Sequence, residues 1–256
     1  MQVNWSSIPS TSFPGWFLRL SLRLIPKTSI VRVRAGLNKG MKWIVGSGTH
    51  GCWLGTYESE KQSTLKQFVK TGMTVFDIGA NAGFYSLAFS RLVGVEGEVW
   101  VFEPSAENAE YLLRHVRLNQ LHNVNLIQAA VSDKNGIVGF QTTGCHATGH
   151  ITDTSQCWVP TVSLDSLIAE NIIPVPDVIK MDVEGAESLV LNGAKDLLNK
   201  KKTTLFIALH GDNQKQHCAE ILRSAGYEIH LLDGQSATSG ELTSDEIYAI
   251  PGRNNV

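Results

Sequence analysis

Residues 74–86, TVFDIGANAGFYS, join an apolar run to a segment with helical spacing through a turn rich in glycine. The apolar run contains Asp77 near its end, and the turn holds Gly79, Asn81 and Gly83. A strand, a glycine turn and a helix in this order bring a nucleotide to the edge of the sheet in many α/β proteins. The same order also forms ordinary joints between strands and helices, so the turn by itself identifies no ligand.

Short apolar runs alternate with helix-length amphipathic stretches from residue 74 onward, which is typical of a parallel sheet covered by helices. The predicted strands lie within residues 74–79, 97–104, 123–132, 176–185 and 203–211. The predicted helices lie within residues 82–93, 105–120, 161–171, 186–200 and 213–226. The remaining apolar runs, residues 227–233 and 246–251, are expected to close the sheet as an antiparallel pair. The sequence therefore predicts an α/β fold with a doubly wound, mostly parallel sheet.

The chain has 256 residues, of which 43% are hydrophobic, and this suffices for the core of one α/β domain. Residues 1–60 fit no strand–helix unit, and we expect them to form a lead-in or cap packed on a main domain of residues 61–256. Between residues 133 and 160, glycine, threonine and histidine dominate. This segment is expected to be an insertion over one end of the sheet.

The charge pattern argues against a nucleic-acid partner, because the net charge is −2 and no long run of one sign occurs. The cysteines are dispersed and predict reduced thiols and a cytoplasmic location. They are Cys52, Cys145, Cys157 and Cys218.

Residues 16–26, WFLRLSLRLIP, are apolar but carry Arg19 and Arg23. The segment is too short and too charged to span a bilayer, and it lacks the apolar core of a signal peptide. We predict an amphipathic helix packed on the domain and no stable membrane insertion. Peripheral contact with a membrane through this segment is the alternative.

The turns that follow the predicted strands are expected to converge, because ligands in open α/β sheets bind beyond the carboxyl ends of the strands. These positions are residues 77–83, Glu103, residues 130–133, residues 182–185 and His210. Their convergence on one rim is the main physical reason to predict a site.

The glycine turn differs from the dinucleotide fingerprint G-x-G-x-x-G, in which the second glycine lets the backbone approach a pyrophosphate. Asn81 replaces that glycine, and Phe84 stands at the position of the last one. Asparagine tolerates a left-handed backbone, so the turn can form, but its side chain crowds the space of a pyrophosphate. Asp77 adds negative charge beside the turn. The pocket is therefore expected to favour a ligand that has a cationic group and no phosphates.

Glu103 stands 20 residues after Gly83, at the end of the second predicted strand. A carboxylate there can accept the ribose hydroxyls of NAD or of another adenosine derivative. Two alternatives stay open on these residues. One is an NAD(P)-dependent oxidoreductase, which Asn81 and Phe84 disfavour, and the other is a non-catalytic protein that binds an adenosine ligand.

Several segments together resemble the FkbM-type methyltransferases, a family of class I enzymes that depend on S-adenosylmethionine. The segments are FDIGANAGFYSL at 76–87, VFEPSAENAEYLLRHVRLN at 101–119, AAVSD at 129–133 and DVIKMDVEGAESLVLNGA at 177–194. The resemblance covers roughly residues 45–230, and this combination is more specific than a single glycine turn. It implies a seven-stranded sheet with an antiparallel last strand, and transfer of a methyl group, usually to oxygen.

The resemblance also implies which residues bind the cofactor, S-adenosylmethionine. Those implied for its methionine part are Asp77, Gly79, Asn81 and Gly83; Glu103 would bind the ribose, and Val131 and Ser132 would lie against the adenine. Residues 42–58, KWIVGSGTHGCWLGTYE, look like the start of some family members. The resemblance therefore assigns this part of the lead-in to the catalytic domain.

The fourth predicted strand ends in charged residues, KMDVEGAE at 180–187. Burying such charges costs free energy unless they pair with each other or take part in chemistry. Asp182 is expected to face both the reactive sulfonium and the acceptor hydroxyl, and Glu184 and His210 complete the predicted catalytic set. A neutral His210 near its ordinary pKa would take the proton of the hydroxyl.

Structural roles are the alternative for these residues: an ion pair of Lys180 with a carboxylate, support of the next helix by Glu184 and Glu187, and a strand-end hydrogen bond of His210. No metal site is predicted, because no dedicated metal spacing occurs. Asp182, Glu184 and His210 nevertheless offer ligands that suit magnesium, and this stays a minor alternative.

The insertion contains a second set of metal-ligand residue types, but their spacing matches no familiar zinc module. They are Cys145, His146, His150 and Cys157. We prefer a role for residues 148–150 in a loop over the acceptor, with residues 49–53 as a candidate for the opposite wall. The polar residues favour a small polar molecule or a glycan as acceptor, methylated on a hydroxyl.

Overall fold

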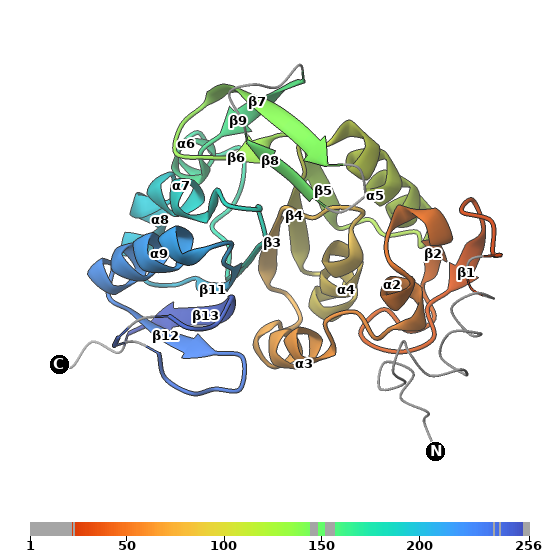
Figure 1. Ribbon diagram of the computed structural model, residues 1–256, viewed down its shortest axis with the longest axis horizontal. Helices are drawn as coiled ribbons and strands as arrows, with labels where there is room; N and C mark the ends of the chain where they lie inside the picture. Colours follow the sequence, from red (N-terminus) through yellow and green to blue (C-terminus); the bar gives the residue numbers. More distant parts are fainter. Residues whose placement is uncertain are drawn as a thin grey trace.

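The computed structural model describes residues 22, 24–143, 148–151, 157–237, 239–240 and 242–252, and a seven-stranded sheet forms its centre (Figure 1). The strands are β3 (Thr74–Ile78), β4 (Glu98–Phe102), β5 (Val124–Ile127), β10 (Val178–Met181), β11 (Thr204–Ala208), β12 (Tyr227–Leu231) and β13 (Glu246–Pro251). Their order in the sheet is β12-β13-β11-β10-β3-β4-β5. β13 runs antiparallel to both of its neighbours, β11 and β12, and the other neighbouring strands of this sheet pair in parallel. The predicted doubly wound, mostly parallel sheet is confirmed, together with its antiparallel last strand.

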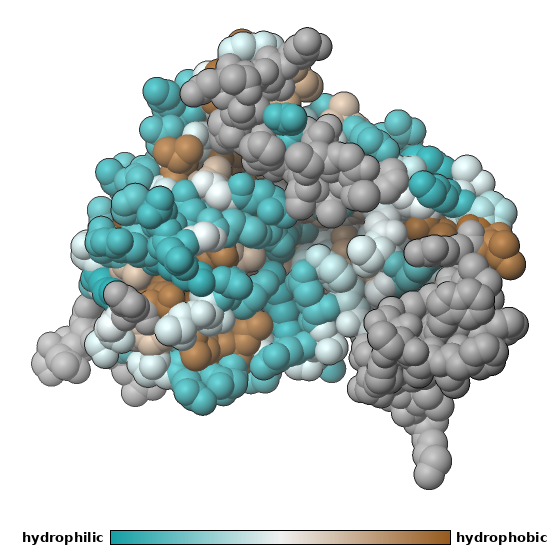
Figure 2. Space-filling model, in the orientation of Figure 1, coloured by the Kyte–Doolittle hydropathy of each residue, from teal (hydrophilic) through white to brown (hydrophobic). Residues whose placement is uncertain are grey.

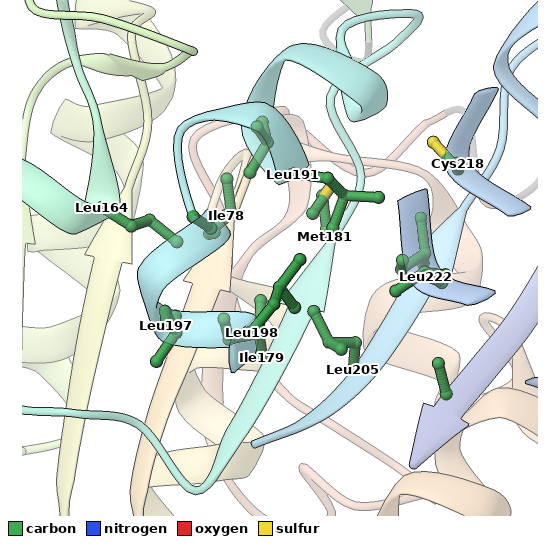
Figure 3. Close-up of a cluster of buried hydrophobic side chains, with 14 of the residues drawn as sticks. Ile78, Leu164, Ile179, Met181, Leu191, Leu197, Leu198, Leu205, Cys218 and Leu222 are labelled. Atoms are coloured by element: carbon green, nitrogen blue, oxygen red, sulfur yellow. The ribbon is translucent and has the colours of Figure 1, made fainter. Parts of the chain in front are cut away.

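Helices cover both faces of this sheet (Figure 1). They are α3 (Ser59–Phe68), α4 (Phe84–Val93), α5 (Ala106–Leu118), α6 (Leu164–Ala169), α7 (Glu187–Asn192), α8 (Lys195–Asn199) and α9 (Asp212–Ser224). Successive strand residues point to opposite faces, so Val75 packs with α3, α4 and α5, whereas Phe76 and Ile78 pack with α6 to α9. Figure 3 shows this second cluster, in which Leu191 and Leu222 of the helices lie near the strands.

The described lead-in packs on the face of the sheet that carries α4. Its elements are β1 (Ile30–Arg32), β2 (Lys42–Ile44), η2 (Val45–Ser47) and α2 (His50–Leu54), and β1 pairs antiparallel with β2. Trp43 and Trp53 are buried in the same hydrophobic cluster as Phe84 of α4. Most of the helix predicted over residues 16–26 lies outside the described residues.

His115 of α5 fastens the lead-in to the glycine turn. Its Nε2 accepts the Ile44 N–H at 3.0 Å, and its Nδ1 lies 2.8 Å from the Ala82 carbonyl oxygen. These partners need a neutral imidazole with the proton on Nδ1. The ring also stacks on Trp43, with 4.0 Å between ring centroids. Burial lowers the pKa of His115 to about 4, because a charged imidazolium would lose its hydration there.

The stability of the protein should therefore fall in acid through His115. Its pKa is lower in the folded than in the unfolded chain, so its contribution is complete above about pH 6.5 and is lost as the pH falls toward 4. The shift corresponds to roughly 3 kcal/mol of unfolding free energy. Urea unfolding at several pH values measures it, with His115→Gln as the non-titrating comparison. Parallel pH profiles of the two proteins would contradict the assignment.

A second sheet forms where the sequence rhythm breaks. Its strands, in spatial order, are β6 (Ala130–Val131), β9 (Trp158–Val162), β7 (Gly136–Thr143) and β8 (Thr148–Ile151). The single strand predicted over residues 123–132 is wrong, because the chain leaves the main sheet after Ile127. The Ala129 N–H bonds back to the Ile127 carbonyl at 2.9 Å, and Val131 then pairs with Val162. Cys145 and His146 lie outside the described residues.

The single helix predicted over residues 186–200 is instead two helices, α7 and α8. The break lies at Gly193, where a Cβ would stand 2.1 Å from the Ser132 carbonyl oxygen, so only glycine lets the chains approach this closely. The Asp165 carboxylate accepts the N–H groups of Asp196 and Leu197 at 2.9 and 3.0 Å. A new helix therefore starts at α8, with its first N–H groups satisfied.

Within the described part of the chain, the structure holds no helix with the length and apolar character that crossing a bilayer requires. Figure 2 shows a largely hydrophilic described surface on one face, with small separate hydrophobic patches. Most of the buried apolar side chains lie in the two clusters on the faces of the sheet. The rim at the carboxyl ends of the strands is therefore where a ligand site is to be sought.

Candidate active site

A cavity of about 310 Å³ lies at the carboxyl ends of β3, β4 and β10. Its wall combines the glycine turn, the strand ends, the lead-in and the second sheet. Six predicted site residues line it: Gly79, Asn81, Glu103, Val131, Asp182 and Glu184. The other predicted residues lie beside or behind the lining and are Asp77, Gly83, Ser132 and His210.

The N–H groups of the glycine turn are already occupied within the protein. Those of residues 79 and 80 donate to the Phe102 carbonyl at 2.9 and 3.2 Å, and that of residue 83 donates to the carbonyl of residue 80 at 2.9 Å. The Asn81 N–H donates to the Glu103 carboxylate, and the Ala82 N–H donates to the Asn81 side-chain oxygen, both at 2.7 Å. A pyrophosphate is held by such N–H groups in dinucleotide folds. This turn is therefore built for a ligand without phosphates.

Three residues with positive φ shape the turn: Gly79, Asn81 and Gly83. Asn81 has a φ of 52°, as its tolerance of the left-handed region predicts, and Gly79 has a φ of 72°. A Cβ on Gly79 would stand 1.9 Å from the Asp182 carbonyl oxygen. The ends of β3 and β10 therefore touch through their backbones, which places the turn against Asp182.

Glu103 is buried and holds neighbouring elements together. Its carboxylate accepts the Asn81 N–H, the Ser105 N–H at 2.9 Å and the Asn108 side-chain amide at 3.4 Å. Burial raises the pKa of Glu103, although these donors and the charge of Lys180 oppose the shift. The carboxylate thus links the glycine turn to the start of α5, in a wall of the cavity.

Asp77 is buried behind the turn rather than in the cavity wall. Strands β3 and β10 are in register with Asp77 beside Lys180, and the two side chains form an ion pair with Oδ1 3.2 Å from Nζ. Asp77 also accepts the Ser86 hydroxyl at 2.6 Å, and Lys180 donates to the Gly79 carbonyl at 3.1 Å. Burial alone would lower the pKa of Lys180, but the charges of Asp77, Asp182 and Glu58 and the hydrogen bond to Asp77 together offset it, and the pKa is raised.

The expectation that Asp77 gives the turn a negative charge needs correction, because Lys180 neutralises it. The negative charge that faces the cavity comes from Asp182 and Glu184 instead. Burial alone would raise the pKa of Asp182, but Lys180, Lys61 and His210 lower it overall, so its carboxylate is ionised at neutral pH.

Asp182, Glu184 and His210 come together as the strand order predicts. His210 Nε2 lies 3.7 Å from Asp182 Oδ1 and 3.4 Å from Glu184 Oε2, and its Nδ1 lies 2.8 Å from Glu187 Oε1. The prediction that His210 is neutral, with a pKa near its ordinary value, is wrong for the protein without bound ligands. Its hydrogen bond to Glu187 raises the pKa of His210 to about 9, with further contributions from the nearby carboxylate charges.

Glu187 belongs to the site, although its sequence position suggested only a role in supporting the next helix. It is fully buried at the first position of α7 and accepts the Gly185 N–H at 3.0 Å besides holding the His210 ring. The spacing of acidic residues in KMDVEGAE places it near the rim, but only the turn at Gly185 directs it toward His210.

The lead-in supplies the opposite wall of the cavity. Its lining residues are Trp43, Ser47, Gly48, Thr49, Cys52 and Tyr57. Residues 49–53 were a candidate for this wall, whereas nothing in the sequence singled out Tyr57. Burial, and then the charge of Glu58, raise the pKa of Tyr57, so its phenol stays neutral.

Three features define a class I methyltransferase: the strand order, the glycine turn whose N–H groups are not available to phosphates, and the charged rim at β10 and β11. Residues 77–229, more than half of the chain, match the family model described as the methyltransferase FkbM domain. The chain belongs to this family of S-adenosylmethionine-dependent methyltransferases.

Two curated relatives and one solved structure place the chain among known proteins. It is 23% identical over 183 residues to the hexuronic acid methyltransferase AglP of Haloferax volcanii, a match that covers 71% of each chain. It is 28% identical over 172 residues to the 2-O-methyltransferase NoeI of Sinorhizobium fredii, covering 59% of this chain and 68% of that protein. The crystal structure of methyltransferase FkbM from Methylobacillus flagellatus matches with a TM-score of 0.50 and 19% identity. That match covers 69% of this chain and 43% of the other, and at 19% identity it concerns the fold alone.

The residues of the cavity fit S-adenosylmethionine. Its sulfonium and amine are cationic, and the wall presents the carboxylates of Asp182 and Glu184. It has no phosphates, in agreement with the occupied N–H groups of residues 79–83. Val131 and Phe140 provide an apolar part of the wall that suits an adenine ring, and Glu103 lies within reach of the same cavity.

Proposed function

We propose that the protein transfers a methyl group to a hydroxyl of a sugar or glycan. The observation that carries this proposal is the pair of carboxylates, Asp182 and Glu184, in the wall of a cavity that fits S-adenosylmethionine. The names of the curated relatives support the acceptor class, since one methylates hexuronic acid and the other is a 2-O-methyltransferase. A polar, hydroxyl-rich acceptor suits this charged rim better than an apolar one.

In this proposal the bound cofactor supplies an electrophilic methyl carbon. The glycine turn and Glu103 hold the methionine and ribose parts, and Val131 and Ser132 flank the adenine. Asp182 accepts a hydrogen bond from the acceptor hydroxyl and takes its proton as the new bond forms. Glu184 and His210 position the acceptor, and Glu187 fixes the His210 ring. The wall of the lead-in excludes water from the reacting atoms.

Asp182→Asn tests the assigned role of the carboxylate. Turnover should fall about a hundredfold, because an amide cannot take the proton of the hydroxyl. Affinity for S-adenosylhomocysteine, measured by titration calorimetry, should change by less than about threefold, since Asn keeps the shape of Asp. Asp212→Asn, at a fully exposed carboxylate on the same rim, is the control and should retain turnover. Equal losses of turnover and affinity would contradict the role.

The acceptor class is tested with labelled S-adenosylmethionine and a panel of uronic acid, hexose and oligosaccharide acceptors, followed by mass spectrometry of the products. Label on a sugar hydroxyl is the expected result. Label only on non-sugar metabolites of a cell extract would contradict the acceptor class. Stabilisation by NAD(H) but not by S-adenosylhomocysteine would favour the oxidoreductase alternative. Cofactor binding without any methyl transfer would favour the non-catalytic alternative.

We also propose that the described lead-in forms one catalytic unit with residues 61–256, because it supplies a wall of the cavity and buries Trp43 against α4 and α5. The described residues of the segment 133–160 would then lie on the acceptor side. A cytoplasmic location and the lack of a nucleic-acid partner remain proposals that rest on composition.

A further inference from the structure

Three potential metal ligands meet at the rim of the cavity. Asp182 and Glu184 follow β10, His210 follows β11, and one ligand atom from each lies within 4.8 Å of the others. The side chains are 24%, 30% and 35% exposed, so a hydrated ion can reach them. Asp182 and Glu184 also line the cavity, which places this cluster beside the reacting atoms.

A second observation concerns the buried carboxylate behind the histidine. Glu187 is 0% exposed, its Oε1 lies 2.8 Å from His210 Nδ1, and its Oε2 has no hydrogen-bond partner among the described residues. Histidines that bind metals commonly hold their other ring nitrogen against a carboxylate, which fixes the ring and its tautomer. The Glu187 contact therefore directs Nε2 of His210 toward Asp182 and Glu184.

The groups around this histidine are mostly acidic. Three carboxylates surround one imidazole, and the buried Lys180 is committed to Asp77 and to the Gly79 carbonyl. Two carboxylates and one imidazole form a ligand set that suits Mn²⁺ and Mg²⁺ and leaves positions for further oxygen ligands. We propose that Asp182, Glu184 and His210 bind a divalent cation of this kind.

The site deepens the proposed sugar O-methylation and rests on it for its chemical role. An ion held by Asp182 and Glu184 lies where the acceptor hydroxyl must approach the cavity. Two neighbouring sugar hydroxyls can complete its coordination, and the ion then lowers the pKa of the attacking hydroxyl, whose proton passes to the Asp182 oxygen that does not bind the ion. The cation would thus orient the acceptor and select vicinal diols over isolated hydroxyls.

Binding of Mn²⁺ to the full chain after EDTA treatment and dialysis tests the site, with free Mn²⁺ followed by electron paramagnetic resonance. We expect about one Mn²⁺ per chain, and at least about tenfold weaker binding for Glu184→Gln, because one ligand is lost. Glu220→Gln, an exposed carboxylate on α9, is the matched control and should bind as the wild type does. Circular dichroism shows whether each variant is folded.

Two outcomes would overturn the proposal. One is no Mn²⁺ binding by the wild type at millimolar concentration, which would leave the cluster as an ion pair of an imidazolium with carboxylates. The other is equal binding by folded Glu184→Gln and wild type. Titration with S-adenosylhomocysteine in EDTA separates this test from the proposed function, because the residues that hold the cofactor can bind it without the cation. Loss of that binding would count against the methyltransferase assignment instead.

Discussion

Gly79→Ala should leave little folded protein and no measurable cofactor binding. The new Cβ would stand 1.9 Å from the Asp182 carbonyl oxygen, and the φ of 72° disfavours any side chain. The left-handed backbone costs about 1–2 kcal/mol, and separating two central strands raises the total to about 4 kcal/mol or more. Urea unfolding and a thermal shift with S-adenosylhomocysteine measure the two effects.

Gly72→Ala is the matched control for this substitution. Gly72 has a φ of 82°, but nothing lies within 4 Å of the position of its Cβ. It should therefore show the backbone cost alone, about 1–2 kcal/mol, and keep its response to the cofactor. Similar losses for Gly79→Ala and Gly72→Ala would show that the contact with Asp182 does not constrain the turn.

The sheet was predictable because its signals are local. Apolar strands, amphipathic helices and glycine turns follow one another along the chain, and each element is recognised within about ten residues. The errors arose where a distant contact decides the outcome. Gly193 ends α7 because the Ser132 backbone lies against it, and the chain turns away from the main sheet after Ile127 to pair with β9.

The candidate site also combines features that local patterns predict with features that distant contacts decide. Asp182, Glu184 and His210 were predicted to meet, because neighbouring parallel strands end at one rim whatever their helices do. The partner of Asp77 was harder to predict, because β10 lies next to β3 in the sheet although about a hundred residues separate them in the sequence. The hydrogen bonds of the neutral His115 ring join it to Ile44 and Ala82, which are distant in sequence, and no local pattern predicts them.

These contacts connect the buried ion pair to the cavity. Lys180 pairs with Asp77 on the face of the sheet that carries α4, and the same ammonium group donates to the Gly79 carbonyl. The charge that stabilises two central strands therefore also fixes the turn of the cofactor site. Stability and cofactor affinity should consequently change together when this lysine is replaced.

Lys180→Met should lower the free energy of unfolding by about 3–5 kcal/mol, because it leaves the Asp77 carboxylate buried without its partner. Asp77 is 0% exposed and Lys180 is 3% exposed, so water cannot replace the lost charge. Affinity for S-adenosylhomocysteine should fall as well, since the Gly79 carbonyl loses a donor. Urea unfolding and titration calorimetry measure these two effects.

The double variant Asp77→Asn/Lys180→Met separates loss of the pair from loss of lysine packing. It should be more stable than Lys180→Met alone by about 2 kcal/mol, because no uncompensated charge remains buried and the Asn amide oxygen can still accept the Ser86 hydroxyl. Lys215→Met, which breaks the more exposed pair with Asp245, should change stability little. If the double variant were less stable than Lys180→Met, the charge of Asp77 would be compensated by other groups.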